Sequence, residues 1–143
     1  MSEHTEYRLL PQPPSALEYL WLRHLAGLRP KSEAQARGAV TGSWSFCHVR
    51  TATGEAVAMG RVIGDGGWYF HLADVATSPS HQRRGMGLRV ARWLLDDIGQ
   101  RAPDGAYVSL VASVAGGRLF EQLGFSDVVA PAGRGMQLVL SAG

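Results

Sequence analysis

Hydrophobic and polar positions along the chain follow two different spacings, and the change falls near residue 44. From Ser15 to Pro30, apolar residues recur every three to four positions, which is the spacing of one face of a helix, and Ser15 stands where an N-cap belongs. Ser32 and Glu33 indicate the start of a second, shorter helix that ends near residue 38 or 42. A short strand over residues 6–10 precedes both helices.

Beyond residue 44 the pattern is that of strands. Residues 44–50, 55–63 and 68–77 are expected to form three strands, joined by tight hairpins at the sequences TATG and GDGG. The glycines of GDGG could belong to a phosphate-binding loop, but the positive φ that a hairpin turn requires is explanation enough. This part of the chain therefore predicts an antiparallel sheet.

In the last third of the chain, predicted helices and strands alternate. A helix is expected with Leu88, Ala91, Leu95 and Ile98 on one face. It is followed by a buried strand over 106–112, a helix over 115–123 with Gly124 just beyond its end, and a final hairpin of 125–129 with 136–140 across APAGRG. The resulting order, β-α-α-β-β-β-α-β-α-β-β, excludes a doubly wound Rossmann fold.

The composition is that of one ordinary globular domain. The 143 residues include 45% hydrophobic and 18% charged residues, with a formal net charge of +2, and we expect a single domain over residues 1–143. All basic residues except Lys31 are arginines, a side chain suited to phosphate and carboxylate contacts. They are scattered rather than clustered, which argues against nucleic-acid binding.

The single cysteine, Cys47, allows no internal disulfide and is typical of a reducing compartment. It is expected to be a small core residue, because Cys47 and His48 are adjacent on a strand and point to opposite faces, unlike a Cys-His nucleophile pair. The first residues carry acids and prolines instead of a signal peptide's features, and no apolar run is long enough to cross a membrane. We therefore expect a cytoplasmic protein without a membrane partner.

The sequence VATSPSHQRRGMGLRVARWLL, residues 75–95, leads from a strand end into a helix. The first turn of a helix has unpaired N–H groups that attract anions, and Gly85 and Gly87 would let a ligand approach this backbone while Arg83 and Arg84 add charge. A diphosphate would fit, although an ordinary loop with solvated arginines explains the segment equally well. Neither GxxxxGK[ST] nor GxGxxG is present, which excludes the common ATP and NAD loops.

Gln82-Arg83-Arg84-Gly85-Met86-Gly87 resembles the acetyl-CoA-binding motif Q/R-x-x-G-x-G/A of the GNAT superfamily of N-acyltransferases. Downstream, GRLFEQLGF over 117–125 resembles the second motif of that superfamily, usually found as LYEKLGF. The resemblance implies an α/β (α+β) fold with a mixed, mostly antiparallel central sheet of about six to seven strands, about four flanking helices, and a splayed parallel pair of strands at the cofactor site.

The resemblance also implies how acetyl-CoA is held. Its pyrophosphate would lie on the N–H groups of the turn, and its pantetheine arm would pair like a strand with the preceding strand end, where an N–H at or near Val75 polarises the thioester carbonyl. Ser113 stands where many members have an asparagine that contacts the cofactor arm. Phe120 stands where the second motif usually has a tyrosine poised to protonate the departing thiolate. The expected acetyl-CoA site comprises Val75, Ala76, Thr77, Gln82, Arg83, Arg84, Gly85, Met86, Gly87, Leu88, Ser113 and Phe120, with no metal.

Amine acetylation requires a group that takes a proton from the amine. His71 and Asp74 are the polar candidates on the strand that enters the first motif. A hydrogen-bonded sheet histidine and a buried carboxylate that orients a loop are the structural alternatives. Strand alternation would place the two on opposite faces unless a bulge intervenes, as is common in the superfamily. Phe120 has no proton to give, so the thiolate is expected to leave without a protein acid.

The acceptor would enter near the first two helices and the final hairpin. Arg29 and Arg134 fall in those loops and would suit an acceptor with a carboxylate, although solvent exposure explains them as well. The expected activity is an acyltransferase that moves an acetyl group from acetyl-CoA to a primary amine of a small molecule or peptide, by direct attack in a ternary complex. Such a chain could also form a homodimer.

Two other classes remain open from the sequence. One is a non-catalytic acetyl-CoA-binding module, which stays open because position 120 is phenylalanine instead of tyrosine. The other is an unrelated basic protein, such as an RNA binder. Titration with acetyl-CoA separates the unrelated basic protein from the acetyltransferase and the binding module. Thiol release over a panel of amines then separates the acetyltransferase from the binding module.

Overall fold

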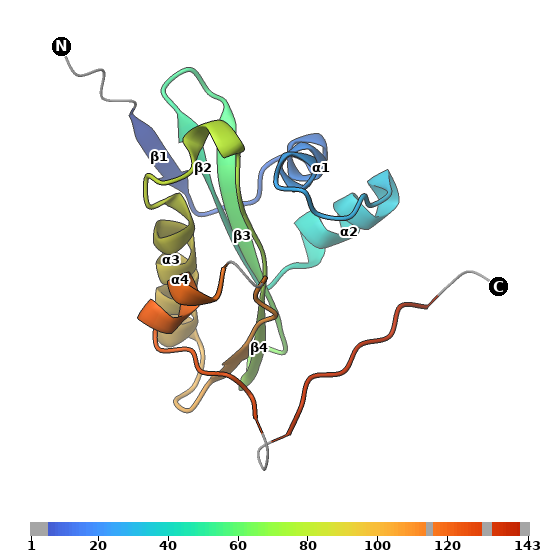
Figure 1. Ribbon diagram of the computed structural model, residues 1–143, viewed down its shortest axis with the longest axis vertical. Helices are drawn as coiled ribbons and strands as arrows, with labels where there is room; N and C mark the ends of the chain where they lie inside the picture. The colour runs from blue at the N-terminus through green and yellow to red at the C-terminus, as the bar shows by residue number, and fades with distance from the viewer. Residues whose placement is uncertain (1–5, 114–115, 130–132, 141–143) are drawn as a thin grey trace.

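The computed structural model describes residues 6–113, 116–129 and 133–140. Its centre is a five-stranded sheet in chain order: β1 (Tyr7–Leu10), β2 (Ser45–Thr51), β3 (Ala56–Gly64), β4 (Tyr69–Thr77) and β5 (Tyr107–Ser109). The first three junctions are antiparallel and β4 pairs with β5 in parallel. The result is a mixed, mostly antiparallel sheet (Figure 1).

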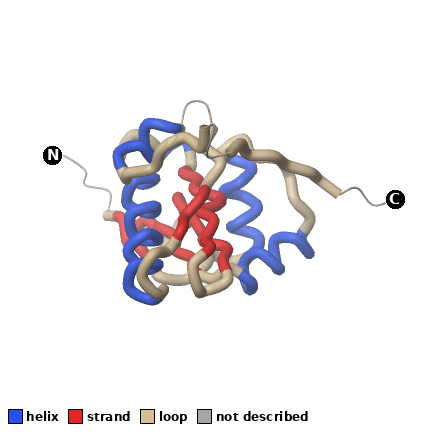
Figure 2. Tube along the Cα trace, turned by 90° about the horizontal axis from the view of Figure 1, so that it is seen from below, coloured by secondary structure: helices blue, strands red, loops and turns tan. Residues whose placement is uncertain are grey.

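Helices cover both faces of this sheet. α1 (Ala16–Leu25) and α2 (Glu33–Gly42) lie on one side, while α3 (Met86–Arg101) and the short α4 (Gly117–Gln122) lie on the other (Figures 1 and 2). A 3₁₀ turn, η1 (Pro79–His81), connects β4 to α3. No helix in the described ranges has the length and apolarity needed to cross a membrane.

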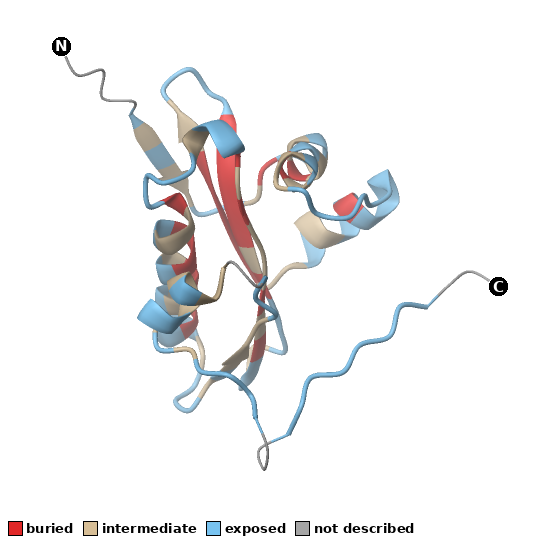
Figure 3. Ribbon diagram, viewed as in Figure 1, coloured by how far each residue is buried: buried red, intermediate tan, exposed pale blue. Residues whose placement is uncertain are grey.

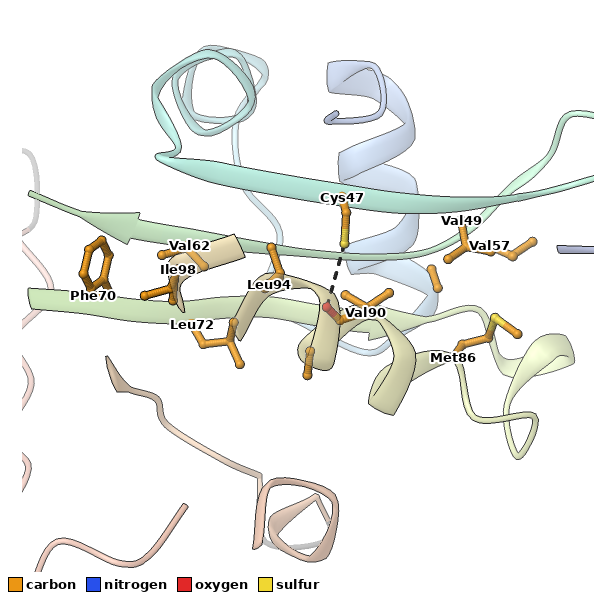
Figure 4. Close-up of a cluster of buried hydrophobic side chains, with 12 residues drawn as sticks. Cys47, Val49, Val57, Val62, Phe70, Leu72, Met86, Val90, Leu94 and Ile98 are labelled. Carbon is orange, nitrogen blue, oxygen red and sulfur yellow. Dashed lines mark hydrogen bonds between the residues drawn. The ribbon is translucent and has the colours of Figure 1, made fainter. Parts of the chain in front are cut away.

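The larger of two hydrophobic cores lies between α3 and the sheet, where Val90, Leu94 and Phe70 are fully buried (Figure 4). A Cβ atom at Gly60 on β3 would lie 2.6 Å from Val90 Cγ1, so glycine is what allows α3 to approach the strand this closely. The second core joins α1 and α2 to the opposite face through Tyr19, Leu22, Ala36, Phe46, Met59 and Ala76. Both faces of the sheet are therefore anchored.

The predicted starts of the first two helices and the first two predicted hairpins are confirmed. Ser15 and Ser32 each cap a helix through a complete capping box, in which the serine side chain and the residue three positions later exchange hydrogen bonds with the backbone. At the hairpins, Gly54 and Gly66 take φ values of +89° and +78°. Asp65 accepts three backbone N–H bonds inside the second turn, which is why GDGG is a hairpin turn.

The predicted apolar face of α3 is shifted by part of a turn. Ala91 and Ile98 are buried as expected, while Leu88 and Leu95 are only half-buried. Met86, Val90 and Leu94 complete the face that packs on the sheet.

The C-terminal third differs most from the prediction. The described residues form five strands, so the expected count of six to seven was too high, and neither 125–129 nor 133–140 forms a strand. β5 is three residues long instead of spanning 106–112, and Tyr107 is 44% exposed instead of buried. The alternating pattern had indicated which residues could pair, but a strand also needs a neighbour, and the described residues beyond Phe125 have none. Residue 115 of the predicted helix and residues 130–132 of the predicted hairpin turn lie outside the described residues, as does residue 114.

Candidate active site

A cleft opens where the two parallel strands separate. β4 and β5 pair only from Tyr69–Tyr107 to His71–Ser109, after which the chains diverge. Residues 72–77 of β4 line one side of the cleft and residues 110–113 line the other, around a volume of about 670 Å³. The splayed parallel pair expected from the resemblance is therefore present.

β4 is bent beside this cleft by a β-bulge. The pairing of β3 with β4 shifts register between Met59 and Arg61, and Asp74 opposite this shift takes a φ of +54°. A bulge re-aims the side chains that follow it. As a result His71 and Asp74 both line the cleft, although regular alternation would have separated them.

The turn between β4 and α3 leaves the start of the helix open. Gly85 is the N-cap of α3, with a φ of +78°, and no side chain caps the helix, in contrast to the serine caps of α1 and α2. The first N–H groups of a helix without a side-chain cap are free to bind an anion. Arg83, in the left-handed region at φ +64°, lies in the wall of the cleft beside this turn.

Gly87 lets α4 approach the first turn of α3. A Cβ atom at Gly87 would lie 2.9 Å from Leu119 Cδ1. This approach brings Phe120 into the cleft wall, where its ring makes an edge contact with Phe125 at 6.0 Å between centroids. Phe120 therefore contributes only hydrocarbon surface to the wall of the cleft.

The cleft gathers most of the residues predicted to form the site. From the predicted sets, those in its wall are His71, Asp74, Val75, Ala76, Thr77, Gln82, Arg83, Gly85, Met86, Gly87, Leu88, Ser113 and Phe120.

Three predicted residues lie outside the cleft wall. Arg84 turns toward β1, where its Nη1 donates to Tyr7 Oη at 2.7 Å. Arg29 is exposed after α1, and its carbonyl accepts a hydrogen bond from Arg23 Nη2 at 2.9 Å. Arg134 is exposed in the C-terminal segment. Ala26 and Leu28, which the sequence did not single out, line the cleft from the loop that carries Arg29.

His71 is held by its neighbour on β5. Its Nδ1 lies 2.9 Å from Ser109 Oγ, and Ser109 Oγ lies 3.5 Å from the carbonyl of Phe70. Burial lowers the pKa of His71 below its usual 6.5, and the positive charge of Arg61 lowers it further. His71 is therefore neutral at pH 7 and able to accept a proton.

Asp74 is saturated with donors. Tyr19 donates to Oδ2 at 2.5 Å, Arg61 Nε donates to the same oxygen at 2.7 Å, and Arg23 Nη1 donates to Oδ1. Burial alone would raise the pKa of Asp74, but the hydrogen bonds from Tyr19 and Arg61 and the nearby arginine charges outweigh it and hold this pKa below 3.8. The carboxylate is ionised, and both of its oxygens are occupied.

The same cluster ties four elements together. Burial, followed by the hydrogen bond to Asp74, raises the pKa of Tyr19 to about 12. Arg61 also reaches Ser43 Oγ, at the end of α2, at 3.2 Å. Tyr19 and Arg23 on α1, Arg61 on β3 and Asp74 on β4 thus fix the first two helices against the cleft. None of these partners of Asp74 was predicted from the sequence, where the local signal was Arg61, an arginine inside the apolar run of β3.

Cys47 has a structural environment, as expected. Its side chain is fully buried under α3, where the thiol donates to the Val90 carbonyl at 3.8 Å (Figure 4), and burial raises its pKa to about 12. His48 points to the other face, where its Nδ1 lies 2.6 Å from the Gln12 carbonyl. Among the residues that the structure describes, no group of three or more His, Cys, Asp or Glu side chains is placed to hold a metal ion.

A splayed parallel pair beside an open helix start defines the class of acyl-group transferases that the sequence resembles. The family model of the GNAT acetyltransferases matches residues 12–125, and the chain belongs to this family. No curated protein sequence matches the chain significantly.

Solved structures agree with this family. A protein of unknown function from methicillin-resistant Staphylococcus aureus, described as a probable acetyltransferase, is 27% identical, with a TM-score of 0.86 over 94% of this chain and 100% of that one. A GNAT family protein from Streptococcus pneumoniae is 19% identical, with a TM-score of 0.77 over 96% and 100% of the two chains. The ribosomal-protein-S18-alanine N-acetyltransferase of Escherichia coli, also 19% identical, has a TM-score of 0.72 over 87% and 80%. The last two likenesses concern the fold alone.

Proposed function

We propose that this acetyltransferase uses acetyl-CoA as donor and transfers the acetyl group to a primary amine of a small molecule or peptide, by direct attack in a ternary complex. The observation that carries the proposal is the continuity of one cleft from the open start of α3, past the unpaired edge of β4, to His71. A long, extended ligand with a diphosphate at one end and a reactive group at the other fits such a cleft.

The residues in the wall suit acetyl-CoA. The N–H groups from Gly85 to Leu88 would hold the pyrophosphate, with Arg83 adding charge. The β4 edge from Val75 to Thr77 would pair with the pantetheine arm, because beyond His71 it has no partner on the β5 side within the described residues. Acetyl-CoA supplies the activated acetyl group, and the N–H of Val75 would polarise its carbonyl.

Of the two candidate bases, the geometry favours His71. It is neutral at pH 7, and its Nδ1 is engaged with Ser109, which leaves Nε2 to accept a proton from the ammonium group of the acceptor, directly or through a water molecule. The neutral amine that results then attacks the thioester carbonyl. Asp74 is a poorer base because it is ionised at low pH and both of its oxygens accept bonds. We assign Asp74 the positioning of α1 and the bulge.

Phe120 cannot protonate the departing thiolate, and we propose that none of the cleft side chains does so. A thiol has an unperturbed pKa near 8.5, so its thiolate is a good leaving group close to neutral pH. Because Phe120 lacks the hydroxyl of the tyrosine usual at this position, a non-catalytic acetyl-CoA-binding module is the second candidate function.

Two measurements on the same preparation test the proposal. Calorimetric titration with acetyl-CoA is expected to show saturable binding at one site per chain. Release of free coenzyme A thiol is then measured over primary amines that include free amino acids, polyamines and peptide N-termini, and at least one is expected to accelerate release. Absence of binding would exclude the donor, and binding without accelerated release from any of these amines would favour the binding module.

A further inference from the structure

An exposed group of aromatic side chains lies beside the proposed active site. Trp68 is 58% exposed, and Tyr69 and Tyr107 are 47% and 44% exposed. The ring centroids of the two tyrosines lie 5.2 Å apart, and the ring of Trp68 lies 5.3 Å from that of Tyr69. Ile63 on β3, which is 46% exposed, completes the group, and we call these four residues the aromatic surface. Contiguous exposed apolar side chains of this kind mark a binding surface.

The strand register places the aromatic surface next to His71. Tyr69 precedes His71 by two residues on β4, and side chains two residues apart point to the same face of a strand. Ile63 lies directly opposite His71 on β3, and Tyr107 lies opposite Tyr69 on β5. The register is regular at these pairs, because the β-bulge lies further along β4. His71 is therefore bordered by exposed apolar side chains both along its own strand and across the sheet.

The helices on this face of the sheet leave the aromatic surface open. Tyr69 faces the side of α1 and α2, because it alternates along β4 with Phe70, which is fully buried in the core between α3 and the sheet. The core beneath α1 and α2 contains Met59 and Ala76, a pair that lies past the bulge from His71. Figure 3 shows β3 buried along most of its length and exposed at its end, toward the turn into β4. A ligand can therefore reach His71 from this face, whereas α3 lies on the opposite face.

The charged groups near the aromatic surface favour an acceptor with a single amine. Arg23 and Arg61 share the carboxylate of Asp74, which leaves one positive charge in excess within that cluster, on the same face as His71. Asp65 lies in the turn at the far end of the aromatic surface, where its Oδ1 accepts three backbone N–H bonds. Apolar surroundings also favour the neutral form of an amine, which is the form that attacks.

We propose that the acceptor is a primary amine with an aromatic ring, which lies on the aromatic surface while the amine group meets Nε2 of His71. This inference rests on the proposed function, because it names the class of amine for the same site. Tyr69 is about 7 Å from His71 along the strand, so a spacer of about two carbon atoms between ring and amine fits. Offset or edge contacts with the tyrosine rings would stabilise the bound ring beyond its buried area.

The reaction is the acetyl transfer proposed above. The ammonium group of the acceptor gives one proton to His71, and the neutral nitrogen forms a bond to the acetyl carbon. The carbon–sulfur bond breaks, and coenzyme A leaves as a thiolate. The second proton of the nitrogen passes through water to that thiolate, so the products are the N-acetyl amine and coenzyme A. The aromatic ring takes no part in these steps and contributes binding alone, equally before and during the transfer.

The first test measures binding without turnover. Phenethylamine, ethylamine and putrescine, a diamine, are titrated calorimetrically into the natural chain with and without saturating coenzyme A, which has no acetyl group to transfer. Phenethylamine is expected to bind at least about tenfold more tightly than either of the other amines, because only its ring can pack on the aromatic surface. Undetectable binding of phenethylamine, affinity equal to that of ethylamine, or tighter binding of putrescine would overturn the proposal.

The second test removes the rings one at a time. Tyr69→Ala and Tyr107→Ala are each expected to lower the ratio of kcat/KM for phenethylamine to that for ethylamine by roughly tenfold, mainly through a higher KM for phenethylamine. Trp21→Ala is the matched control, since it removes a 56% exposed ring on α1 and should leave the ratio unchanged. Circular dichroism and urea unfolding check that each variant is folded. The same ratio in the natural chain and in both tyrosine variants would overturn the proposal.

The aromatic surface and the proposed activity fail separately in these tests. Preferential binding of phenethylamine without thiol release from acetyl-CoA would reject the acetyltransferase activity and leave the aromatic surface as a binding site for aromatic amines. Thiol release with equal kcat/KM for phenethylamine and ethylamine would support the activity and reject the aromatic surface as the acceptor site.

Discussion

His71 Nδ1 lies 2.9 Å from Ser109 Oγ, directly across the β4–β5 pair. Ser109 in turn donates its hydroxyl proton to the Phe70 carbonyl, at 3.5 Å. With the Ser109 hydroxyl turned toward this carbonyl, the serine oxygen accepts from Nδ1–H, and in that tautomer the lone pair of the neutral imidazole lies on Nε2. The last paired residues of the parallel strands thus set the orientation of the candidate base.

Replacement of His71 by glutamine is expected to reduce kcat/KM by about 10²–10⁴ while acetyl-CoA binds as before. In the natural chain, kcat/KM should rise with pH and level off above an apparent pKa below 6.5, because burial and Arg61 favour the neutral imidazole. The variant should lose this acidic limb. Thiol release measured from pH 5 to pH 8 checks both effects, and an unchanged limb would remove His71 as the base.

Replacement of Ser109 by alanine is expected to lower kcat/KM by roughly tenfold, the low end of the 10–100-fold losses typical when a group that orients a metal-bound histidine is removed. The apparent pKa of the acidic limb should move at the same time. Ser109→Thr keeps the hydroxyl and should restore most of the activity. If alanine and threonine behave alike in the pH profile, the hydroxyl does not act through His71.

Replacement of Gly85 by valine is expected to weaken acetyl-CoA binding by more than about tenfold, because a β-branched residue disfavours positive φ and would crowd the N–H groups at the start of α3. Gly54→Val is the matched control. Gly54 also has positive φ, at +89°, and open space around it, but it lies in the β2–β3 turn away from the cleft. Calorimetry and urea unfolding on both variants should show similar losses of stability and a loss of affinity only at Gly85.

Replacement of Asp74 by asparagine is expected to cost about 3–5 kcal/mol in the free energy of unfolding, because it leaves Arg23 and Arg61 partly buried without their counter-charge. Asp97→Asn is the comparison. Asp97 pairs with the half-exposed Arg101, so this change should cost less. Urea unfolding at pH 7 measures both, and equal costs would mean that the cluster around Asp74 is not an anchor.

The same carboxylate gives a pH dependence. The pKa of Asp74 is lower in the folded chain than its unfolded value of 3.8, so its stabilisation is complete above pH 3.8 and is lost as pH falls through the lower folded value. The Asp74→Asn variant should therefore lose less stability than the natural chain in this acid range.

Local sequence signals were sufficient for the first part of the fold. The serine caps, the two hairpin turns and the change of period near residue 44 each depend on a few neighbouring residues, and all are confirmed. The C-terminal strands failed because strand formation depends on a partner edge. The apolar pattern of residues 136–140 contains no information about where that edge lies.

The site divides in the same way. The two glycine-containing motifs located the turn and most of the cleft wall, because those residues act through their own backbone. The partners of Asp74 lie up to 55 positions away along the chain, at Tyr19 on α1. The bulge that brings His71 and Asp74 to one cleft comes from a register shift between β3 and β4, which the family resemblance allowed for but no local pattern indicates. Such long-range pairings cannot be read from one sequence.

The complete burial of Cys47 makes the reactivity of its thiol a measure of local opening in the folded chain. Because the single thiol is fully buried and its pKa is raised to about 12, the folded chain should react slowly with the disulfide reagents used to count released coenzyme A, which keeps the background of that assay low. Labelling of Cys47 then requires α3 to separate from the sheet. The rate of labelling with and without acetyl-CoA would measure how strongly a ligand at the start of α3 holds the entire helix in place.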